Sequence, residues 1–324
     1  MTLTSRRRFL QSACAVGAAS SLAGCMSPEP QASAQPSAKP AGKGFFARHN
    51  LPIGIQVYTL GDLPKNDLDG TMKKVGGIGY KTVELAGYLG KTPQQLRAAF
   101  DAAGLKCTSA HIGLAKGTAE EPKLFDDIGR VAADMRVIGA SQVIAPALAR
   151  PDDLKVGGYG DLAKAMTADH WKRQAAQLND IGEKFKAEGI VFGYHNHNIE
   201  FAPVGNSNGL ELLIANTDPQ YCTFELDIGW VAAGGGDPTA FFNKHSGRFV
   251  AAHIKDVKAS TVTNYEVKMD PTEVGSGKLD WKTILPAAYS AGVRKFFVEQ
   301  EAPFAFERLE SARICFQYLN ALNA

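Results

Sequence analysis

The chain has 324 residues, with 35 basic and 33 acidic side chains and a formal net charge of +2 at neutral pH. Proteins that bind a nucleic-acid backbone usually concentrate an excess of basic residues on one surface, so this balance argues against a nucleic-acid partner. The length exceeds that of a minimal single domain, and the N-terminal segment accounts for part of the excess.

Residues 1–25 have the pattern of an export signal. Three arginines, Arg6–Arg8, precede a short apolar stretch from Ala13 to Ala23, which is too short to span a bilayer. The adjacent arginines resemble a twin-arginine signal. The following Cys25 completes a resemblance to the lipobox of bacterial lipoproteins, although ordinary cleavage with an unmodified Cys25 is the alternative. We expect an exported protein, either periplasmic or held at a membrane by a lipid anchor at Cys25.

The next segment, residues 26–43, is rich in Pro, Ser, Ala, Gln and Gly. Such a composition cannot bury enough apolar surface to offset the entropy of ordering, so we expect a flexible linker. The remaining residues, 44–324, match the size of one α/β barrel. This part contains three widely spaced cysteines, which predict buried thiols rather than a disulfide framework: Cys107, Cys222 and Cys315.

One pattern repeats from residue 51 to the end: a helical stretch ends in Gly, and an apolar run of strand length follows. The Gly supplies the left-handed turn that ends a helix, and the apolar runs are typical of parallel strands covered on both faces. The expected strands are 53–57, 82–85, 107–111, 143–145, 190–194, 222–227, 249–254 and 296–299. The expected helices are 92–103, 121–138, 168–187, 238–245, 280–291 and 305–322.

Eight strands that alternate with helices predict a TIM-type (β/α)₈ barrel. The alternative is an open, doubly wound sheet, which would need a Gly-rich phosphate-binding loop after its first strand. The segment Tyr58-Thr59-Leu60-Gly61-Asp62 is not such a loop. We therefore expect a closed barrel whose catalytic groups lie at the C-terminal ends of the strands.

Polar side chains stand at the ends of six expected strands. Residues two apart on a strand point the same way, so several of these residues form same-face pairs. The second and third strands end in Glu84 and His111, and the last four supply His195 with His197, Glu225 with Asp227, His253 with Lys255, and Glu299 with Glu301. Such crowded charged and imidazole groups are costly unless they are paired or bind a metal. A mixed set of nitrogen and oxygen ligands suits one divalent cation: Mn²⁺, Mg²⁺, Co²⁺ or Zn²⁺.

Three of these strands each deliver a metal-ligand side chain at the same level, and we predict that Asp227, His253 and Glu299 bind the cation. Structural roles remain open for three other residues: His111 as a hydrogen-bonded strand end, Glu225 as a partner of a base such as Lys255, and Asp256 as a loop cap.

Six motifs combine these residues: Tyr194-His195-Asn196-His197-Asn198-Ile199-Glu200-Phe201, Phe224-Glu225-Leu226-Asp227-Ile228-Gly229-Trp230, Gly247-Arg248, His253-Ile254-Lys255-Asp256, Val274-Gly275-Ser276-Gly277 with Asp280, and Val298-Glu299-Gln300-Glu301. Over residues 50–322 the chain resembles the sugar phosphate isomerase/epimerase branch of the xylose isomerase-like TIM barrels. Relatives of that kind hold one divalent metal with Glu, Asp, His and Glu from strands 5 to 8. The resemblance implies Asp227, His253 and Glu299 as three ligands and His195, where ketose epimerases have Glu, as the fourth.

The resemblance also implies the chemistry. Isomerisation, epimerisation and dehydration of sugars all begin when a base removes a proton next to a carbonyl, and a metal stabilises the resulting enediolate. Inosose dehydratases similarly carry a His cluster on the fifth strand, so lyase chemistry is an alternative. We expect Glu299 to be one base and Glu200, His195 or Glu301 to be the other. The expected catalytic residues are Glu299, Glu200, Lys255 and His111, and the expected substrate-binding residues are Glu84, His197, Trp230, Tyr58 and Glu301.

The sequence thus predicts a metal-dependent isomerase or epimerase of a free, keto or glycosidic sugar outside the cytoplasm, where phosphorylated sugars are scarce. Alternatives are a dehydratase of keto-sugars or keto-inositols, an endonuclease of the same superfamily, and a sugar-binding lipoprotein without turnover. An endonuclease would need more metal ligands and a basic groove, and a binding protein would lack the ligands that are present. The expected partner is a small carbohydrate, membrane contact is expected only through Cys25, and an oligomer remains open.

Overall fold

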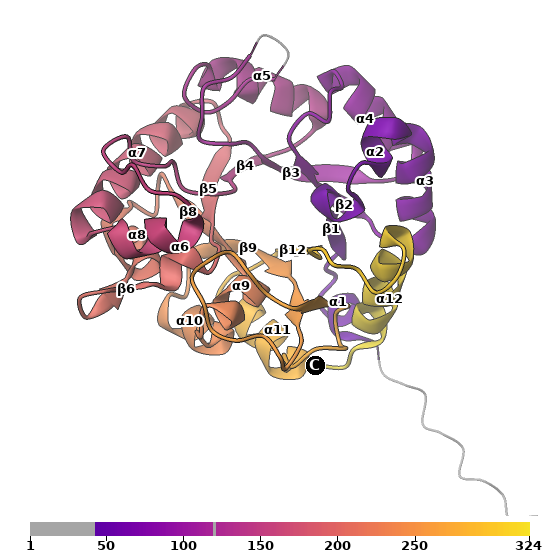
Figure 1. The fold of residues 1–324 in the computed structure, drawn as a ribbon. Coiled ribbons are helices and arrows are strands. Elements are labelled where there is room, and N and C mark those ends of the chain that lie inside the picture. Colours follow the sequence, from indigo (N-terminus) through magenta and orange to yellow (C-terminus); the bar gives the residue numbers. More distant parts are fainter. Residues whose placement is uncertain (1–42, 119–120) are drawn as a thin grey trace, which may run out of the picture. The chain divides into compact units, whose positions relative to one another are not determined.

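The computed structural model describes residues 43–118 and 121–324, and its eight main strands close into a parallel barrel (Figure 1). Each of these strands pairs with the next along the chain, and β1 pairs with both β2 and β12 to complete the ring. This arrangement confirms the predicted (β/α)₈ barrel and excludes the open sheet. The strands are β1 (Gly54–Gln56), β2 (Thr82–Ala86), β3 (Lys106–His111), β4 (Gln142–Ala145), β5 (Val191–His195), β8 (Thr223–Asp227), β9 (Phe249–Ile254) and β12 (Lys295–Val298).

The longer helices surround the barrel, and the colours in Figure 1 follow the sequence around it. They are α3 (Leu68–Ile78), α4 (Pro93–Ala102), α5 (Ile128–Ile138), α7 (Ala168–Ala187), α8 (Gly209–Asn216), α10 (Pro238–Lys244), α11 (Trp281–Ser290) and α12 (Arg308–Ala321). Shorter elements are α1 (Phe45–Arg48), η1 (Val57–Leu60), α2 (Leu63–Asn66), α6 (Tyr159–Ala165), η2 (Ile199–Phe201) and α9 (Ile228–Ala233). Two small ribbons pair β6 (Pro203–Val204) with β7 (Ser207–Asn208) and β10 (Asp256–Val257) with β11 (Pro271–Thr272).

The predicted export signal and nearly all of the predicted linker, residues 1–42, lie outside the described residues. Within the described part of the chain, no helix combines the length and apolar character that a membrane-spanning segment needs.

Local signals account for several element ends. Thr92 caps α4 through a reciprocal pair of hydrogen bonds with Gln95, which satisfies backbone N–H groups that the helix leaves free. Gly139 follows α5 with a φ of 95°, a left-handed conformation that other residues adopt only with strain. The other predicted helix-ending glycines also have positive φ: Gly79, Gly104, Gly189 and Gly292.

The predicted helices differ from the structure at α5, α3 and α8. The helix predicted over residues 121–138 begins only at Ile128, because the Asp127 carboxylate accepts the Arg130 N–H and starts the helix there. The predicted helices do not include α3, although Gly79 was expected to end a helix; three glycines in its eleven residues lower its intrinsic helix propensity. Its Gly76 packs so closely that a Cβ atom would lie 2.3 Å from the Ala103 carbonyl oxygen, so packing stabilises this helix. Helix α8 was not predicted either.

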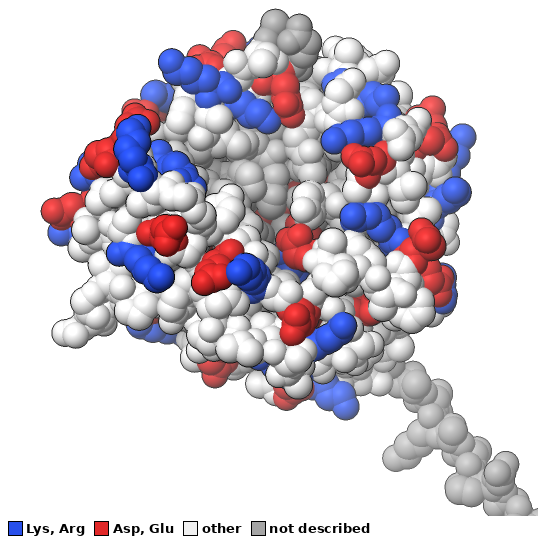
Figure 2. All heavy atoms as spheres, in the orientation of Figure 1, with Lys and Arg blue, Asp and Glu red and all other residues white. Residues whose placement is uncertain are grey.

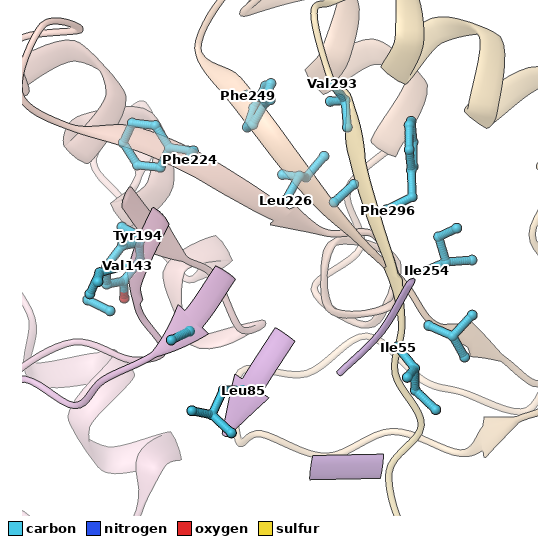
Figure 3. Packing of buried hydrophobic residues seen from close by; sticks show 14 of the residues in the cluster. Ile55, Leu85, Val143, Tyr194, Phe224, Leu226, Phe249, Ile254, Val293 and Phe296 are labelled. Atoms are coloured by element: carbon cyan, nitrogen blue, oxygen red, sulfur yellow. The ribbon is translucent and has the colours of Figure 1, made fainter. Parts of the chain in front are cut away.

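The apolar core lies mainly between the barrel and its helices. Figure 3 shows how strand side chains such as Phe224, Leu226, Phe249 and Ile254 pack in this layer. All four are buried, as are the free thiols that the sequence predicted to be core residues, Cys107, Cys222 and Cys315. The alternate residues of the same strands point into the barrel, where several charged side chains are fully buried.

Candidate active site

The carboxyl ends of the parallel strands bring the predicted polar residues to one mouth of the barrel. Asp227 illustrates how local structure aims a side chain. It ends β8 and caps α9, so its Oδ1 accepts the Trp230 N–H at 2.8 Å, while its own N–H donates to Asn196 Oδ1 at 3.0 Å. Its other oxygen, Oδ2, is buried and forms no hydrogen bond with any described residue. It pairs instead with the Lys255 ammonium, whose Nζ is 2.9 Å away.

Four buried residues converge on one point: His195, Asp227, His253 and Glu299. One ligand atom from each lies within 4.8 Å of all the others. Asp227 Oδ2 is 3.8 Å from His195 Nε2 and 3.7 Å from His253 Nδ1. Neighbouring ligands of a tetrahedral Zn²⁺ site, with bonds of about 2.0–2.2 Å, stand roughly 3.4 Å apart. These separations and the mixed imidazole and carboxylate ligand set therefore fit a divalent cation.

A lysine ammonium lies beside this cluster. Lys255 Nζ is 2.7 Å from Glu299 Oε2, 2.9 Å from Asp227 Oδ2 and 3.1 Å from Glu301 Oε1, and it stands over the Trp230 ring. Burial alone would lower the pKa of Lys255, but the three carboxylates outweigh burial and raise it well above its usual value. Lys255 is thus a fixed cation, fully buried beneath the cavity wall.

A second group of contacts lies deeper in the barrel. Glu84 Oε2 is 2.6 Å from His253 Nε2 and 3.1 Å from His111 Nε2. Glu225 Oε2 is 2.8 Å from His111 Nε2 and 3.1 Å from His253 Nε2. Glu225 is therefore buried and paired with basic side chains, as its structural interpretation expected, but these are imidazoles and not Lys255.

Neighbouring charges shift the pKa values of the side chains in this deeper group. Burial alone would lower the pKa of His111, but the charge of Glu84 and a hydrogen bond to Glu225 raise it to about 9. Burial and the charge of Glu84 would raise the pKa of Glu225, yet the neighbouring imidazoles hold it at about 2. At neutral pH, without a metal, the mouth therefore contains ionised carboxylates beside a cationic His111.

Glu200 points elsewhere. Its carboxylate accepts hydrogen bonds from the Tyr194 hydroxyl and from the His197 backbone N–H. Burial raises the pKa of Glu200 to about 7. Glu200 lines a separate, smaller cavity beside Leu148 and Tyr159, so the structure does not bring it to Glu299.

A cavity of about 750 Å³ opens above the cluster. His111, His195 and Glu299 form part of its wall, and so do the predicted substrate-binding residues Tyr58, His197, Trp230 and Glu301. Glu84, also predicted to bind substrate, is fully buried below it. Figure 2 shows this barrel hollowed near its centre, with basic and acidic side chains mixed around the hollow.

Sequence reasoning missed some contributors. Gln56 ends β1 and donates its amide N–H to Glu84 at 2.9 Å; it obeys the same strand-end rule as the predicted residues and could have been found by it. Glu121, Lys123 and Lys268 also line the cavity, but they come from loops, for which strand periodicity gives no signal.

Asp256 has the structural role that the sequence left open. Its carboxylate accepts N–H groups from Gly275 and Gly277 and from the Trp281 indole. A Cβ atom on Gly277 would lie 2.1 Å from Asp256 Oδ1, so only glycine fits there. The Gly-Ser-Gly motif therefore anchors the loop that follows β10.

The closed barrel and its cluster of imidazole and carboxylate groups define a (β/α)₈ protein with a site suited to a divalent cation. Residues 72–308 match the family model of the xylose isomerase-like TIM barrels, and the chain belongs to that family. The family resemblance predicted from the motifs is thereby confirmed.

Several relatives cover most of the chain. It is 24% identical to an inosose dehydratase of Lacticaseibacillus casei over 287 residues, which are 83% of this chain and 95% of the relative. A sugar phosphate isomerase/epimerase structure from Parabacteroides distasonis ATCC 8503 superposes with a TM-score of 0.66 at 26% identity, covering 83% of this chain and 97% of that one. The probable 3-DHS dehydratase AsbF of Bacillus anthracis shares the fold, with a TM-score of 0.59 at 12% identity over 83% and 98% of the two chains.

Proposed function

We propose that this protein is a metal-dependent lyase that removes a proton next to the carbonyl of a keto-sugar or keto-cyclitol and then eliminates water. The metal would be held by His195, Asp227, His253 and Glu299. When bound, a divalent cation supplies Lewis-acid stabilisation of the negative charge that develops on the substrate oxygens. The similarity to an inosose dehydratase supports this reaction class.

The observation that carries the proposal is the position of Glu200. Epimerisation by two opposed carboxylates requires a second glutamate across the cavity from Glu299. Here the oxygens of Glu200 accept hydrogen bonds from Tyr194 and His197, and imidazoles occupy the cavity wall instead. Glu301 also lines the cavity, but its Oε1 pairs with Lys255 Nζ at 3.1 Å on the same strand end as Glu299. Glu299 with several imidazoles suits elimination better than a symmetric proton shuttle.

The residues of the cavity wall can complete the elimination. Glu299 takes the proton from the carbon next to the carbonyl, and those electrons form the new carbon–carbon double bond. The carbon–oxygen bond of the neighbouring hydroxyl breaks, and a proton from the cationic His111 converts the departing hydroxyl to water. His111 suits this role because its ring reaches the cavity wall and its pKa of about 9 keeps it charged at neutral pH.

An isomerase or epimerase is the second candidate. It would need a group that returns the proton at another position, and His197 on the cavity wall is such a group. Burial lowers the pKa of His197 to about 4, so its imidazole is neutral at pH 7 and can accept and return a proton. The similarity to the Parabacteroides distasonis structure supports this candidate.

The test is incubation of Mn²⁺-loaded protein in deuterated water with a keto-inositol and a panel of 3-keto-sugars. Magnetic resonance follows exchange of the hydrogen next to the carbonyl, and absorbance follows the conjugated product of water loss. Exchange with water loss supports the lyase. Exchange with every carbon–oxygen bond retained identifies an isomerase or epimerase, and saturable binding without exchange identifies a sugar-binding protein.

We also propose that residues 1–25 direct export and that Cys25 carries a lipid, so that the protein works in the periplasm or at a membrane. The support is the pattern of arginines, apolar residues and Cys25. Fractionation of cells that express the full chain and a Cys25→Ser variant tests the proposal. The variant is expected to leave the membrane fraction for the periplasmic one, and an unchanged distribution would contradict lipidation.

A further inference from the structure

Two histidines at the barrel mouth each use their two ring nitrogens in opposite directions. His195 directs Nε2 toward Asp227, at 3.8 Å from Oδ2, and Nδ1 toward Glu225, at 3.3 Å from Oε2. His253 directs Nδ1 toward Asp227 and Glu299, and Nε2 toward Glu84 and Glu225. Each ring therefore joins an upper group of possible metal ligands to a lower pair of carboxylates, Glu84 and Glu225.

Distances decide what the lower contacts are. Neighbouring ligands around a cation stand about 3.0 Å apart in an octahedral site with bonds of about 2.1 Å, and roughly 3.4 Å apart in a tetrahedral one. The contacts of 2.6 Å from His253 Nε2 to Glu84 and 2.8 Å from His111 Nε2 to Glu225 are shorter than either value. Their lengths are those of hydrogen bonds between a ring N–H and a carboxylate. The ligand atoms of His111, His195, Glu225 and His253 also lie within 4.8 Å of one another, but these short contacts favour hydrogen bonding in the deeper group.

We propose that Glu84 and Glu225 are positioning residues that set which ring nitrogen of His195 and His253 carries the hydrogen. In this structure His253 Nδ1 is also 2.9 Å from Glu299 Oε2, so both of its ring nitrogens contact carboxylates. When a cation binds, each lower nitrogen would keep its hydrogen and its carboxylate partner, and His195 Nε2 and His253 Nδ1 would give their lone pairs to the cation. A neutral imidazole carries only one ring hydrogen, so fixing it at one nitrogen leaves the other free to bind metal. The inference rests on the metal of the proposed function, but it concerns binding rather than turnover.

Backbone irregularities support a specific aim for both carboxylates. The register between β2 and β3 shifts between Val83 and Glu84, and the register between β8 and β9 shifts between Phe224 and Glu225. The extra residue lies on the partner strand in each case, Thr108 in β3 and Val250 in β9. Such bulges re-aim the strands that carry His111 and His253 relative to the two carboxylates. Both carboxylates thus stand where two strands depart from regular pairing, and both turn toward the same imidazoles.

The arrangement is also costly for folding. Glu84 and Glu225 are fully buried, and within the described chain Glu84 Oε1 and Glu225 Oε1 form no hydrogen bonds. Burying an unsatisfied polar atom costs about 1–3 kcal/mol. Well-packed apolar residues at such positions are often as stable as a buried ion pair or more so. Folding stability alone does not explain why carboxylates occupy these two positions. Orientation of the metal ligands does explain it.

The test is calorimetric titration of metal-free protein with Mn²⁺, without substrate, for the wild type and for Glu84→Gln and Glu225→Gln. A glutamine at position 225 cannot accept hydrogens from three imidazoles, and loss of such outer partners typically weakens metal affinity 10- to 100-fold. Both variants are expected to lose affinity within that range. Glu200→Gln is the matched control, because Glu200 is an equally buried glutamate whose hydrogen-bond partners are Tyr194 and the His197 backbone. It is expected to change affinity less than about twofold.

A second measurement needs no variant and so does not depend on variant folding. Nitrogen chemical shifts of the histidine rings in Zn²⁺-loaded wild-type protein are expected to place hydrogen on His195 Nδ1 and His253 Nε2. The opposite assignment, or affinities of both variants that match the wild type, overturns the inference while leaving the lyase proposal intact. Absence of metal binding in the wild type would overturn both.

Discussion

The two faces of a single strand carry different properties of this protein. Along β8, Phe224 and Leu226 point outward into the apolar layer under the helices, whereas Glu225 and Asp227 point into the barrel. The outward residues bury hydrocarbon and stabilise the fold. The inward residues bury charge, which costs free energy unless it is paired. Residues that stabilise the fold therefore alternate along the strand with residues that form the site. Substitutions on the outward face should change stability, and substitutions on the inward face should change activity or metal binding.

The largest expected effect is on the inner face. Glu299→Gln keeps the shape of the side chain but removes its charge and basicity, so turnover is expected to fall by roughly 10²- to 10⁴-fold from the loss of base catalysis alone. The fold is expected to survive, because the packing layer lies on the other face of the strands. Turnover with saturating Mn²⁺ and a melting curve test this together. Near-normal turnover would shift the base to another residue, and loss of activity through unfolding would assign Glu299 a structural role.

The converse substitution is Leu226→Ala on the outer face. Leu226 is fully buried, and truncation of such a leucine typically costs about 2–5 kcal/mol of unfolding free energy. Mn²⁺ affinity under native conditions is expected to stay within a few-fold of the wild type, since the metal ligands remain in place. Denaturant unfolding and metal titration measure the two quantities. A large loss of affinity with little loss of stability would show that the two faces are not separable.

A smaller effect concerns pH. The pKa of His111 rises from 6.5 to about 9 in the folded, metal-free protein, so its contribution to stability is complete below about pH 6.5 and is lost as the pH rises through about 9. For Glu225 the pKa falls from 4.5 to about 2, so its contribution is present above about pH 4.5 and is lost at lower pH.

Metal-free protein is therefore expected to be most stable between about pH 4.5 and 6.5. The His111 contribution is worth on the order of 3 kcal/mol. Melting temperatures across this range measure it, and a His111→Gln variant is the control that should lose most of the alkaline slope. A wild-type melting temperature that stays level between pH 6.5 and 9 would contradict the pairing of His111 with the two carboxylates.

The smallest expected effect comes from the segment before the barrel. Removal of residues 1–43 is expected to change the melting temperature by no more than about 1 °C, because their composition predicts no packed structure. The cut must leave Phe45, whose N–H donates to the Leu322 carbonyl and joins α1 to the end of the chain. A drop of several degrees would show that the barrel uses this segment.

Prediction from the sequence succeeded where the signal was local. The helix-ending glycines and the apolar runs depend on nearby residues, and they located all eight barrel strands to within one or two residues. The strand-end rule also brought forward Asp227, His253 and Glu299, which the structure gathers at one point.

The tertiary structure decided which side chains face one another. Strand periodicity states that a residue points inward, but its partner depends on how far each strand is displaced along its neighbour. That displacement pairs Asp227 with His253 across β8 and β9, where an extra residue in β9, Val250, sets the position of His253 relative to Glu225. Glu200 follows the end of β5 by five residues, and the path of that loop, which no strand period describes, turned its carboxylate to Tyr194. The barrel and the kinds of side chain at its mouth follow from local periodicity and could be predicted from the sequence, whereas contacts between distant segments required the closed barrel.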